Sequence, residues 1–535
     1  MHNYLYINQH LQRENPSNPV IISFLSCDEM EFQYLVSFFL FMSFLFFLIQ
    51  KWRSSKTLKK KLPPGPWRLP IIGSVHHLTK GVPHRVLKNL SEKYGPIMYL
   101  QLGEVPTIVV SSPHMAKQVL KTHDLAFASR PETMMGKIIC YDCTDIAFSP
   151  YGDYWRHMRK LSTLELLSAK MVKSFSPIRQ EELSNLLSSI GSMDVDLPIN
   201  LPEKLLWFMN AVTCRSAFGK VCKDQKELIT LIHQAQSLSG GFELADLFPS
   251  KKILHGISGM KSKLMKARNK VDVVLDNIIN LHRENRANGR SCNGESGAED
   301  LIDVFLRVIE SGEFPFPLTN DNIKAVILDM FVAGSDTSSS TVIWALSEMI
   351  KSPSVMAKAQ AEVRKVFKGK KTYDDETDLE KLDYLKLVIK ETLRLHPPTP
   401  LLVPRECREE TNIDGFTIPS KSKVMVNVWA IGRDCESWEN PECFKPERFE
   451  NNSIEFTGNH FQFLPFGAGR RICPGIQFGL ALVTLPLAHL LYKFDWKLPK
   501  GVNAKDLDMT EANGISARRQ SDLYLITTPY VSPLD

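Results

Sequence analysis

Residues 461–475, which read FQFLPFGAGRRICPG, decide the fold of this 535-residue chain. They hold one cysteine, Cys473, in a loop whose glycines permit backbone conformations closed to other residues. Pro474 fixes the φ angle directly after the sulfur, so the loop presents the thiol rather than hiding it. Arg470 and Arg471 precede the cysteine, and the apolar pattern after it predicts a helix that begins near the sulfur. Because nearby positive charge and a helix N-terminus both lower the pKa of a thiol, we expect a thiolate at Cys473.

A lone thiolate limits the metal centres that this loop can build. No second cysteine or histidine stands at ligand spacing, which excludes a zinc or iron–sulfur site. A haem iron needs only one such ligand, because the porphyrin fills its in-plane positions. Two alternatives are a glycine-rich turn around a structural cysteine and a dinucleotide-binding loop at Gly467 and Gly469. The second is weak, since Ile472 occupies the third glycine position and no βαβ unit follows.

The spacing Phe466-x-x-Gly469-x-Arg471-x-Cys473-x-Gly475 resembles that of the cytochrome P450 family, the haem-thiolate monooxygenases. Five positions with the required residue types, together with the motifs described below, seldom occur by chance in an unrelated turn. The resemblance covers the chain from about residue 30 to its end. It implies the cytochrome P450 fold and a haem cofactor (iron protoporphyrin IX), with Cys473 as axial iron ligand and with Phe466 and Arg471 against the cofactor. The implied reaction inserts one atom of O2 into a C–H bond and releases the other as water.

The composition indicates a globular protein with a large apolar core, since 43% of the residues are hydrophobic. Much of the net charge of +6 comes from a lysine-rich run at residues 51–61, so the charge balance does not indicate nucleic-acid binding. The ten cysteines form no regular framework, which favours reduced thiols in a cytosol-facing protein. Cys140 and Cys143 form a CxxC without the second pair that zinc would need.

Residues 32–50 are the candidate membrane anchor, preceded by a polar extension at residues 1–31. Residues 32–49 read FQYLVSFFLFMSFLFFLI, close to the roughly 20 residues that span a bilayer. Acidic residues precede the span and basic residues follow it, which places the rest of the chain in the cytosol by the positive-inside rule. A cleaved signal peptide is the alternative, but the span lacks a small-residue cleavage site. A further hypothesis starts translation at Met30 instead of Met1.

Residues 51–66 predict a basic and proline-rich hinge, and residues 67–535 the haem-thiolate monooxygenase domain. Residues 96–110 alternate around Gly103 and predict a β-hairpin, and Asp414-Gly415 predicts the turn of a second one. Residues 284–300 lack an apolar period and predict a mobile surface loop without function of its own. The remaining pattern is mainly helical. The expected fold class is therefore mainly α with a small β region, preceded by an N-terminal transmembrane helix.

A helical pattern of about thirty residues runs from Asn320 to Ile350, long enough to cross the domain. Its middle reads AGSDTS at residues 333–338, where glycine and hydroxyl residues are poor helix formers and indicate a functional irregularity. The string resembles the oxygen-activation motif of the family. Proton delivery to the oxygen needs an acid beside an orienting hydroxyl, so we assign Thr337 to hydrogen-bond the oxygen and Asp336 to deliver protons through water. The alternative is a serine- and threonine-rich face packed in the core.

Trp155 and Arg159, four residues apart, share one face of a predicted helix and match the W-x-x-x-R pattern of the family. The resemblance implies that both bind haem propionates, for which Arg and Trp N–H donors are suited. It implies the same role for Arg130 and Arg405. Without the resemblance, the Trp155 and Arg159 pair is more typical of an ordinary amphipathic helix.

Glu391 and Arg394 stand three residues apart, which by itself is typical of a surface pair. Together with the string Pro446-Glu447-Arg448-Phe449, they resemble the E-x-x-R and PERF elements of the family. The resemblance implies a buried triad of Glu391, Arg394 and Arg448 that braces the cysteine loop without taking part in the chemistry.

The substrate side of the site is less specific in the sequence. By resemblance, the residues that face substrate are Ala333, Leu402, Val403 and Ile515. Strings such as KLPPGPW and PYGDYWRHMRKL resemble plant microsomal members, most closely the sesquiterpene hydroxylases of the nightshade type, so a sesquiterpene hydrocarbon is the expected substrate. A monoterpene, an alkaloid or a phenolic stays open. A haem-thiolate isomerase or dehydratase and a non-enzymatic haem carrier are rival functions, and the Asp336-Thr337 pair argues against both.

The chain contains no convincing flavin or nicotinamide motif of its own. The resemblance therefore implies that electrons come from NADPH through a separate NADPH–cytochrome P450 reductase, with cytochrome b5 as a further candidate partner. It also implies a single-pass protein of the endoplasmic reticulum membrane whose catalytic domain faces the cytosol.

Overall fold

The computed structural model describes residues 33–47, 61–194, 196–219, 227–232, 244–251, 259–288, 299–312, 314–369 and 376–531. Contacts divide the chain into two units, Met1–Lys61 and Leu62–Asp535. In the first unit the described helix Gln33–Phe47 exposes apolar side chains along its whole length, with Tyr34 70% and Phe41 60% exposed. The expectations for residues 1–31, for Met30 and for most of the basic hinge lie outside the described residues.

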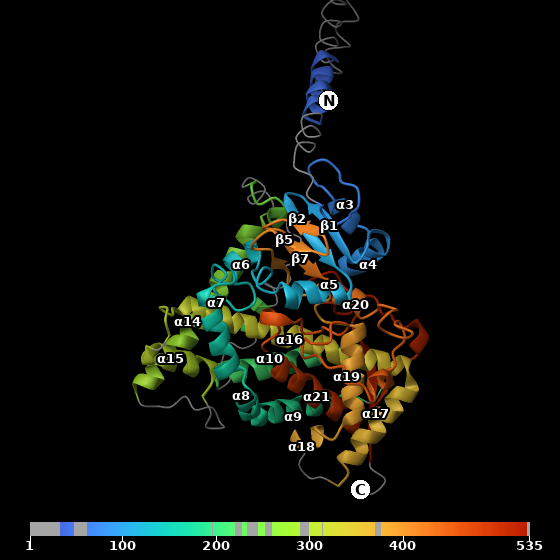
Figure 1. Ribbon diagram of the computed structural model, residues 1–535. Coiled ribbons are helices and arrows are strands. Elements are labelled where there is room, and N and C mark those ends of the chain that lie inside the picture. The colour runs from blue at the N-terminus through green and yellow to red at the C-terminus, as the bar shows by residue number, and fades with distance from the viewer. Residues whose placement is uncertain are drawn as a thin grey trace, which may run out of the picture. The chain divides into compact units, whose positions relative to one another are not determined.

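The main sheet of the second unit has the strand order β1-β2-β7-β4 (Figure 1). Strands β1 (Ile97–Leu102) and β2 (Val105–Val110) pair antiparallel and confirm the predicted hairpin. Gly103 at its turn has a φ of +61°, and an added Cβ would lie 2.4 Å from the carbonyl oxygen of Leu247. Glycine is therefore required there by conformation and by space. β2 pairs in parallel with β7 (Lys423–Val426), which also binds β4 (Arg405–Glu406).

Two smaller sheets complete the β structure. Strands β5 (Thr411–Ile413) and β6 (Phe416–Ile418) form the second predicted hairpin. Its turn residues Asp414 and Gly415 both have positive φ, 49° and 79°, as a two-residue turn of this hand requires. The third sheet has the order β3-β9-β8, with bounds Ile199–Asn200, Tyr524–Pro529 and Phe494–Lys497.

Helices make up most of the second unit, and the long helix α16 (Asn320–Lys351) runs through its middle (Figure 1). It agrees with the predicted helix to within one residue, and it stays helical through residues 333–338. Its main helical neighbours are α10 (Leu201–Phe218) and α21 (Ile476–Lys493). The other α-helices are α3 (Val75–Leu78), α4 (Pro83–Tyr94), α5 (Pro113–Lys117), α6 (Met134–Ile138), α7 (Asp153–Leu161), α8 (Ala169–Ser174), α9 (Ser176–Gly191), α12 (Leu244–Leu247), α14 (Met260–Ala287), α15 (Leu301–Ser311), α17 (Pro353–Val366), α18 (Glu376–Leu379), α19 (Asp383–Leu395) and α20 (Val428–Ile431).

The loop predicted at residues 284–300 is only partly an irregular segment. Helix α14 continues into it as far as Ala287, and Asp300 caps the start of α15 with its side chain. Polar composition misled the prediction at both ends, because helix caps and exposed final turns are also polar. Residues 289–298 lie outside the described part of the chain.

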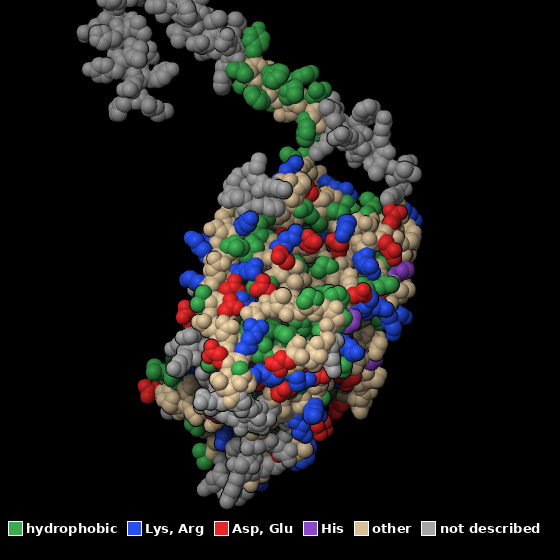
Figure 2. Space-filling model, turned by 90° about the vertical axis from the view of Figure 1, so that its left-hand side faces the viewer, with side chains coloured by type: hydrophobic (Ala, Val, Ile, Leu, Met, Phe, Trp, Pro, Cys, Tyr) green, Lys and Arg blue, Asp and Glu red, His purple; other side chains and the backbone are tan. Residues whose placement is uncertain are grey.

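Among the described residues, one helix is long and apolar enough to cross a membrane by length and composition, and this is α21. Over half of it, 56%, is buried inside the unit, and it packs against α16, α17 and α19. Its hydropathy is therefore that of a core helix. Helix Gln33–Phe47 is apolar but shorter. On the face of the second unit seen in Figure 2, basic and acidic side chains are interspersed rather than separated by sign.

Candidate active site

A large cavity lies between α16 and residues 465–475, the cysteine loop. Its empty volume is about 1520 Å³, part of it open to solvent. Cys473 lines it from the loop, and Thr337 lines it from α16. The remaining wall is largely apolar and includes Met330, Leu393, Leu402, Val403, Phe466 and Phe478. The two strongest motifs of the sequence, 136 residues apart, therefore meet at one cavity.

The cysteine loop has the geometry that its glycines suggest at two of three positions. Gly467 and Gly469 have φ values of +70° and +68°, whereas Gly475 has an ordinary φ of −94°. An added Cβ at Gly469 would lie 2.1 Å from the carbonyl oxygen of Leu120, so a larger residue there must displace backbone. The backbone N–H of Cys473 donates to the carbonyl of Phe466 at 3.0 Å, which closes the loop.

The expectation of a low thiol pKa at Cys473 is wrong for the protein alone. Burial is the largest influence and raises the pKa, while a hydrogen bond from the Gly475 backbone and the charge of Arg159 lower it by less. Arg470, which was counted among the lowering charges, instead pairs with Asp124 at 2.8 Å. If Cys473 ligates a metal it would lose its proton there, since a thiol that coordinates a metal is deprotonated outright.

Four buried or half-buried arginines line the cavity: Arg130, Arg159, Arg405 and Arg471. Most of their hydrogen bonds go to backbone carbonyls. Arg130 donates to the carbonyls of Ala147, Val403 and Pro404, Arg471 to those of Ala128, Ile146 and Ser149, and Arg159 to that of Ile472. Within the described part of the chain, Asp124 is the one carboxylate in ion-pair contact with any of the four, at 3.0 Å from Arg405.

Three of these arginines, Arg130, Arg159 and Arg471, have no carboxylate in ion-pair contact among the described residues. Burial and the charges of Arg471 and Arg405 hold the pKa of Arg130 well below its ordinary value. Burial and the charges of Arg405 and Arg159 lower the pKa of Arg471 to about 9. Like charges buried together are stable only when an anion neutralises them, so the cavity is built for a ligand with negative groups.

The residues present fit haem. A porphyrin carries two carboxylates for the arginines and an iron that a single thiolate can ligate, and its ring needs an apolar cavity such as this one. Trp155 does not line the cavity. Its indole N–H donates to the carbonyl of Ile146 at 3.0 Å, and the Arg471 guanidinium lies 3.9 Å from the centre of its ring. Contact between Trp155 and a propionate stays a prediction.

On α16, Thr337 and Asp336 point to different partners. The Thr337 hydroxyl donates to the carbonyl of Ala333, one turn earlier, at the cavity wall. The Asp336 carboxylate accepts a hydrogen bond from the Ser516 hydroxyl and does not line the cavity. No sequence signal indicated that Ser516 would bind Asp336, although Ser516 belongs to the string Asn513-Gly514-Ile515-Ser516 that resembles a substrate loop of the family.

Three of the four predicted substrate residues line the cavity: Ala333, Leu402 and Val403. Ile515 does not, and its side chain is 38% exposed on the outside of the unit. The C-terminal loop, residues 513–516, therefore contacts α16 through Ser516, while Ile515 lies outside the cavity. Leu402 has a φ of +52°, a strained conformation for a non-glycine residue, and its Cδ1 lies against Gly467.

A carboxyl pair beside the cavity was not anticipated. Asp329, on α16, lines the cavity and accepts from the backbone N–H groups of Ile146 and Ala147 at 2.7 and 3.1 Å. Its neighbour Asp145 is also buried and hydrogen-bonds it. Burial and the charge of Asp145 raise the pKa of Asp329 well above its ordinary value, which favours the neutral carboxyl. No sequence signal linked two acids 184 residues apart.

The structure brings Glu391, Arg394 and Arg448 together. Arg394 makes a two-point contact with Glu391, 2.8 Å for each pair of atoms, and both side chains have no exposed surface. Arg448 Nε lies 2.8 Å from the same carboxylate, and the backbone N–H of Lys445 donates to it at 2.8 Å. The buried carboxylate of Glu391 is therefore paired within the protein by both arginines and by a backbone N–H.

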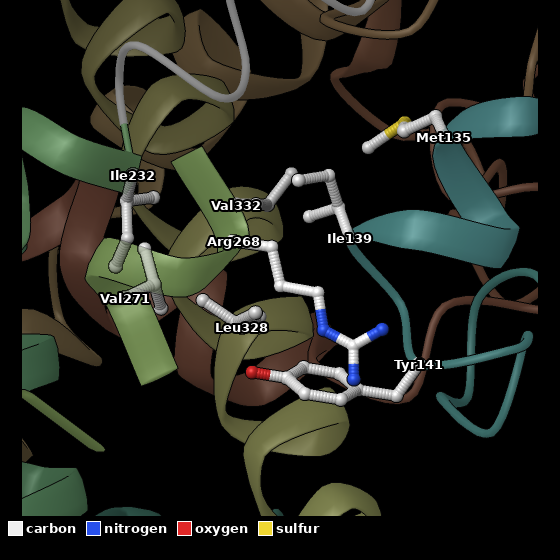
Figure 3. Close-up of a pocket in the computed structure, with 8 residues that line it drawn as sticks. All are labelled: Met135, Ile139, Tyr141, Ile232, Arg268, Val271, Leu328 and Val332. Carbon is white, nitrogen blue, oxygen red and sulfur yellow. The ribbon is translucent and has the colours of Figure 1, made fainter. Parts of the chain in front are cut away.

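A smaller cavity with an empty volume of about 360 Å³ lies beside α16 (Figure 3). Leu328 and Val332 reach it from α16, one position before Asp329 and Ala333 of the large cavity. Arg268 lies over the ring of Tyr141, 4.2 Å from its centre, and the Tyr141 hydroxyl donates to Asp272 at 2.6 Å. These contacts hold a segment with three successive positive φ angles, 49°, 57° and 57° at residues 141–143, against α14.

The fold and this cavity define a haem-dependent oxygenase. The sequence profile of the family described as Cytochrome P450 matches residues 63–526. The chain belongs to the cytochrome P450 family. As a cytochrome P450 monooxygenase it binds haem and uses O2 together with electrons derived from NADPH.

Relatives and solved structures agree with this assignment. The chain is 60% identical over 501 residues to premnaspirodiene oxygenase of Hyoscyamus muticus, covering 94% of this chain and 99% of that protein. It is 58% identical to 5-epiaristolochene 1,3-dihydroxylase of Nicotiana tabacum, again over 94% and 99%. Germacrene A hydroxylase of Barnadesia spinosa is 52% identical over 91% of this chain and 96% of its own. A zebra fish cytochrome P450 solved with progesterone has the same fold, with a TM-score of 0.71 at 24% identity, over 84% of this chain and 99% of that one.

Proposed function

We propose that this protein is a membrane-anchored monooxygenase that hydroxylates a sesquiterpene hydrocarbon. The observation that carries the proposal is the shared cavity, where Cys473 and Thr337 face a largely apolar space. The relatives named for premnaspirodiene, 5-epiaristolochene and germacrene A all act on sesquiterpene hydrocarbons, and they are 52% to 60% identical to this chain. An apolar wall binds such a substrate by burial of its surface and offers few groups for polar recognition.

The acids near the cavity are compatible with a hydrocarbon substrate. Asp329 is the carboxyl group that reaches the wall, and its raised pKa favours the neutral form. Its Oδ2 also accepts two backbone N–H bonds. An amine or another cationic substrate would find its partner already engaged. This supports a hydrocarbon over an alkaloid, while a monoterpene and a neutral phenolic stay as alternatives.

In this proposal Cys473 would ligate the haem iron, and Arg130, Arg159, Arg405 and Arg471 would hold the propionates. Phe466 packs at the cavity wall against the ring. Bound haem supplies the activation of dioxygen. The buried triad of Glu391, Arg394 and Arg448 keeps residues 445–448 in place and thereby braces the segment that leads into the cysteine loop.

Proton delivery in this proposal runs from Asp336 to Thr337. The Thr337 hydroxyl donates to Ala333, so its oxygen keeps capacity to accept a hydrogen bond from a water in the cavity. Asp336 is held by Ser516 beside the cavity, and water connects its carboxylate to the Thr337 hydroxyl. The apolar wall limits the entry of other water, which keeps reduction and hydroxylation coupled.

The membrane and electron-supply roles rest on the first unit and on the family. Helix Gln33–Phe47 carries exposed aromatic and aliphatic side chains, which water does not favour and a bilayer does. A single anchor in the endoplasmic reticulum membrane would leave the catalytic unit in the cytosol. There it would accept electrons from NADPH–cytochrome P450 reductase, with cytochrome b5 as a further donor, through complementary surface charge.

The test is product analysis by gas chromatography and mass spectrometry after co-expression with a plant reductase. A panel of sesquiterpene hydrocarbons is supplied with ¹⁸O₂, and a Cys473→Ala protein serves as the control without the iron ligand. We expect hydroxylated products that carry one ¹⁸O atom, require NADPH and are absent from the control. Products formed without NADPH would support an isomerase or dehydratase instead. Products only from monoterpene, alkaloid or phenolic panels would overturn the substrate class while leaving the monooxygenase in place.

A further inference from the structure

Three potential metal ligands, His282, Asp300 and Asp303, meet where α14 ends and α15 begins. All three are buried, with 5%, 3% and 2% of their surfaces exposed. One imidazole nitrogen and one oxygen from each carboxylate lie within 4.8 Å of one another. None of the three lines the large cavity, so the active site does not explain this cluster.

The hydrogen-bond partners of His282 require a cation beside it. Its Nδ1 lies 2.8 Å from the carbonyl of Ile278, which can only accept, so Nδ1 carries a hydrogen. Its Nε2 lies 2.9 Å from Asp300 Oδ2, a carboxylate oxygen that also accepts. Either a proton or a metal ion must lie between these two atoms. A histidine whose Nδ1–H donates to a backbone carbonyl has the orientation usual for a metal ligand.

The surroundings of Asp303 distinguish between a proton and a metal ion at this position. Its Oδ1 is buried and has no hydrogen-bond partner among the described residues. Arg286 Nη1 lies 3.8 Å away, beyond hydrogen-bond distance, and the same guanidinium binds Glu310 at 2.6 Å. A proton shared by His282 and Asp300 leaves this oxygen unmatched, which is costly for a buried carboxylate. A metal ion would use it as a third ligand.

We propose that His282, Asp300 and Asp303 bind a divalent transition-metal ion, with Zn²⁺ as the probe. One imidazole and two carboxylates suit such an ion and neutralise its charge. Tetrahedral coordination at ligand distances of about 2.0–2.1 Å needs ligand atoms about 3.3 Å apart, and the present spacing reaches this by small side-chain rotations. Water completes the fourth position.

The ion would join two helices without disturbing the cap of either. Asp300 Oδ1 accepts from the backbone N–H of Asp303 at 2.9 Å and caps α15, so Oδ2 is the oxygen left for the metal. His282 lies in the last turns of α14. The ion therefore stabilises the junction between α14 and α15 and leaves the haem chemistry unchanged.

The experiment uses the full-length holoprotein in detergent, purified through a tag without histidine, stripped with EDTA and titrated with ZnCl₂ by calorimetry. Asp303→Asn and His282→Gln remove one ligand each. His114→Gln is the matched control, since His114 Nε2 lies 2.8 Å from Asp414 Oδ2 in an exposed pair. We expect one Zn²⁺ per chain with a Kd in the micromolar range or below, a higher unfolding temperature with Zn²⁺, and affinity at least about tenfold weaker in the first two variants.

The carbon-monoxide difference spectrum of each variant checks that the haem site is intact, and Asp303→Asn carries the test if His282→Gln does not fold. X-ray absorption at the zinc edge should show one imidazole nitrogen among the ligands. The proposal is overturned if the wild-type protein binds no Zn²⁺ below about 100 µM. It is equally overturned if Asp303→Asn binds Zn²⁺ as the wild type does, or if His114→Gln loses the ion.

Discussion

The catalytic unit contains two sets of buried arginines, and their charges are balanced in opposite ways. Arg394 and Arg448 share the carboxylate of Glu391, which also accepts a backbone N–H. The four arginines of the large cavity have between them one ion-pair contact with a described carboxylate, that of Arg405 with Asp124. The first set is complete within the protein, whereas the second requires a ligand.

This difference separates a structural role from a binding role where the amino-acid type does not. In both sets guanidinium groups donate to several backbone carbonyls, as Arg394 does to Gly432 and Pro441. In the cavity set the arginines lower the pKa values of one another. Mutual repulsion in a buried position is therefore the signature of the cofactor site.

The largest effect is expected from Glu391→Gln, which removes the carboxylate that Arg394 and Arg448 share. The change leaves Arg394 and Arg448 without their shared carboxylate in a fully buried position. We expect a loss of about 3–5 kcal/mol in the free energy of unfolding. Thermal unfolding and the yield of protein with an intact carbon-monoxide difference spectrum measure it. Glu455→Gln is the control, because Glu455 is 45% exposed and pairs with Lys390 on the helix of Glu391, so its loss should cost only about 0–1 kcal/mol. Equal effects of the two changes would contradict the distinction.

The second prediction concerns the four arginines of the large cavity, and the size of its effect should depend on whether haem is bound. Arg130→Gln removes a group that we propose binds a propionate, so we expect haem affinity to fall about 10- to 100-fold, the value of one charge-assisted hydrogen bond. In the haem-free protein the same change relieves repulsion with Arg471 and Arg405, which offsets part of the lost carbonyl contacts. The loss of stability should therefore be larger with haem than without it.

Haem content per chain, the rate of haem transfer to an acceptor protein and unfolding of both forms measure the effect of Arg130→Gln. Arg408→Gln is the control, since Arg408 is exposed and donates weakly, at 3.4 Å, to the carbonyl of Leu125. If Arg130→Gln protein keeps haem as the wild type does, Arg130 belongs with the structural arginines.

The third prediction concerns Thr337, which lines the cavity from α16. Thr337→Ala should retain haem and substrate binding, while product formed per NADPH falls about 100-fold and peroxide rises, at the low end of effects from lost proton-transfer groups. Thr163→Ala is the control, because its hydroxyl also donates to the carbonyl four residues earlier but lies outside the cavity. Coupling that equals the wild type in Thr337→Ala protein would remove Thr337 from the proposed proton path.

Features that depend on local chemistry could be predicted from the sequence. Positive φ at Gly103 and Gly415 places the two hairpin turns, and the apolar period of α16 predicts its ends to within one residue. The cysteine loop was predicted from spacing, and Gly467 and Gly469 have the left-handed conformations expected of them.

Features that depend on tertiary packing could not be predicted in this way. The pKa of Cys473 is set mainly by burial, which a sequence does not display, and the nearby Arg470 binds Asp124 instead. The Trp155 indole N–H donates to Ile146, because α7 lies against the segment that precedes it. Asp145 and Asp329 meet only when that segment packs on α16. In the C-terminal loop, the direction in which the chain turns determines that Ser516, and not Ile515, contacts α16.

That loop provides the smallest and most specific prediction. Ser516→Ala removes the hydroxyl that donates to Asp336, so the carboxylate is no longer held beside Thr337. One hydrogen bond contributes about 1 kcal/mol net, so we expect product per NADPH to fall about fivefold and the solvent deuterium isotope effect on coupling to rise. Ser521→Ala is the matched control, since Ser521 donates to Asp508 at 2.5 Å in the same C-terminal segment, on the exterior. A larger isotope effect in Ser516→Ala alone would tie the loop to proton delivery, because a change that only loosened the fold would alter haem content and leave the isotope effect unchanged. If neither quantity changes, Asp336 is positioned by α16 itself, and the acid–hydroxyl pair acts without support from the C-terminal loop.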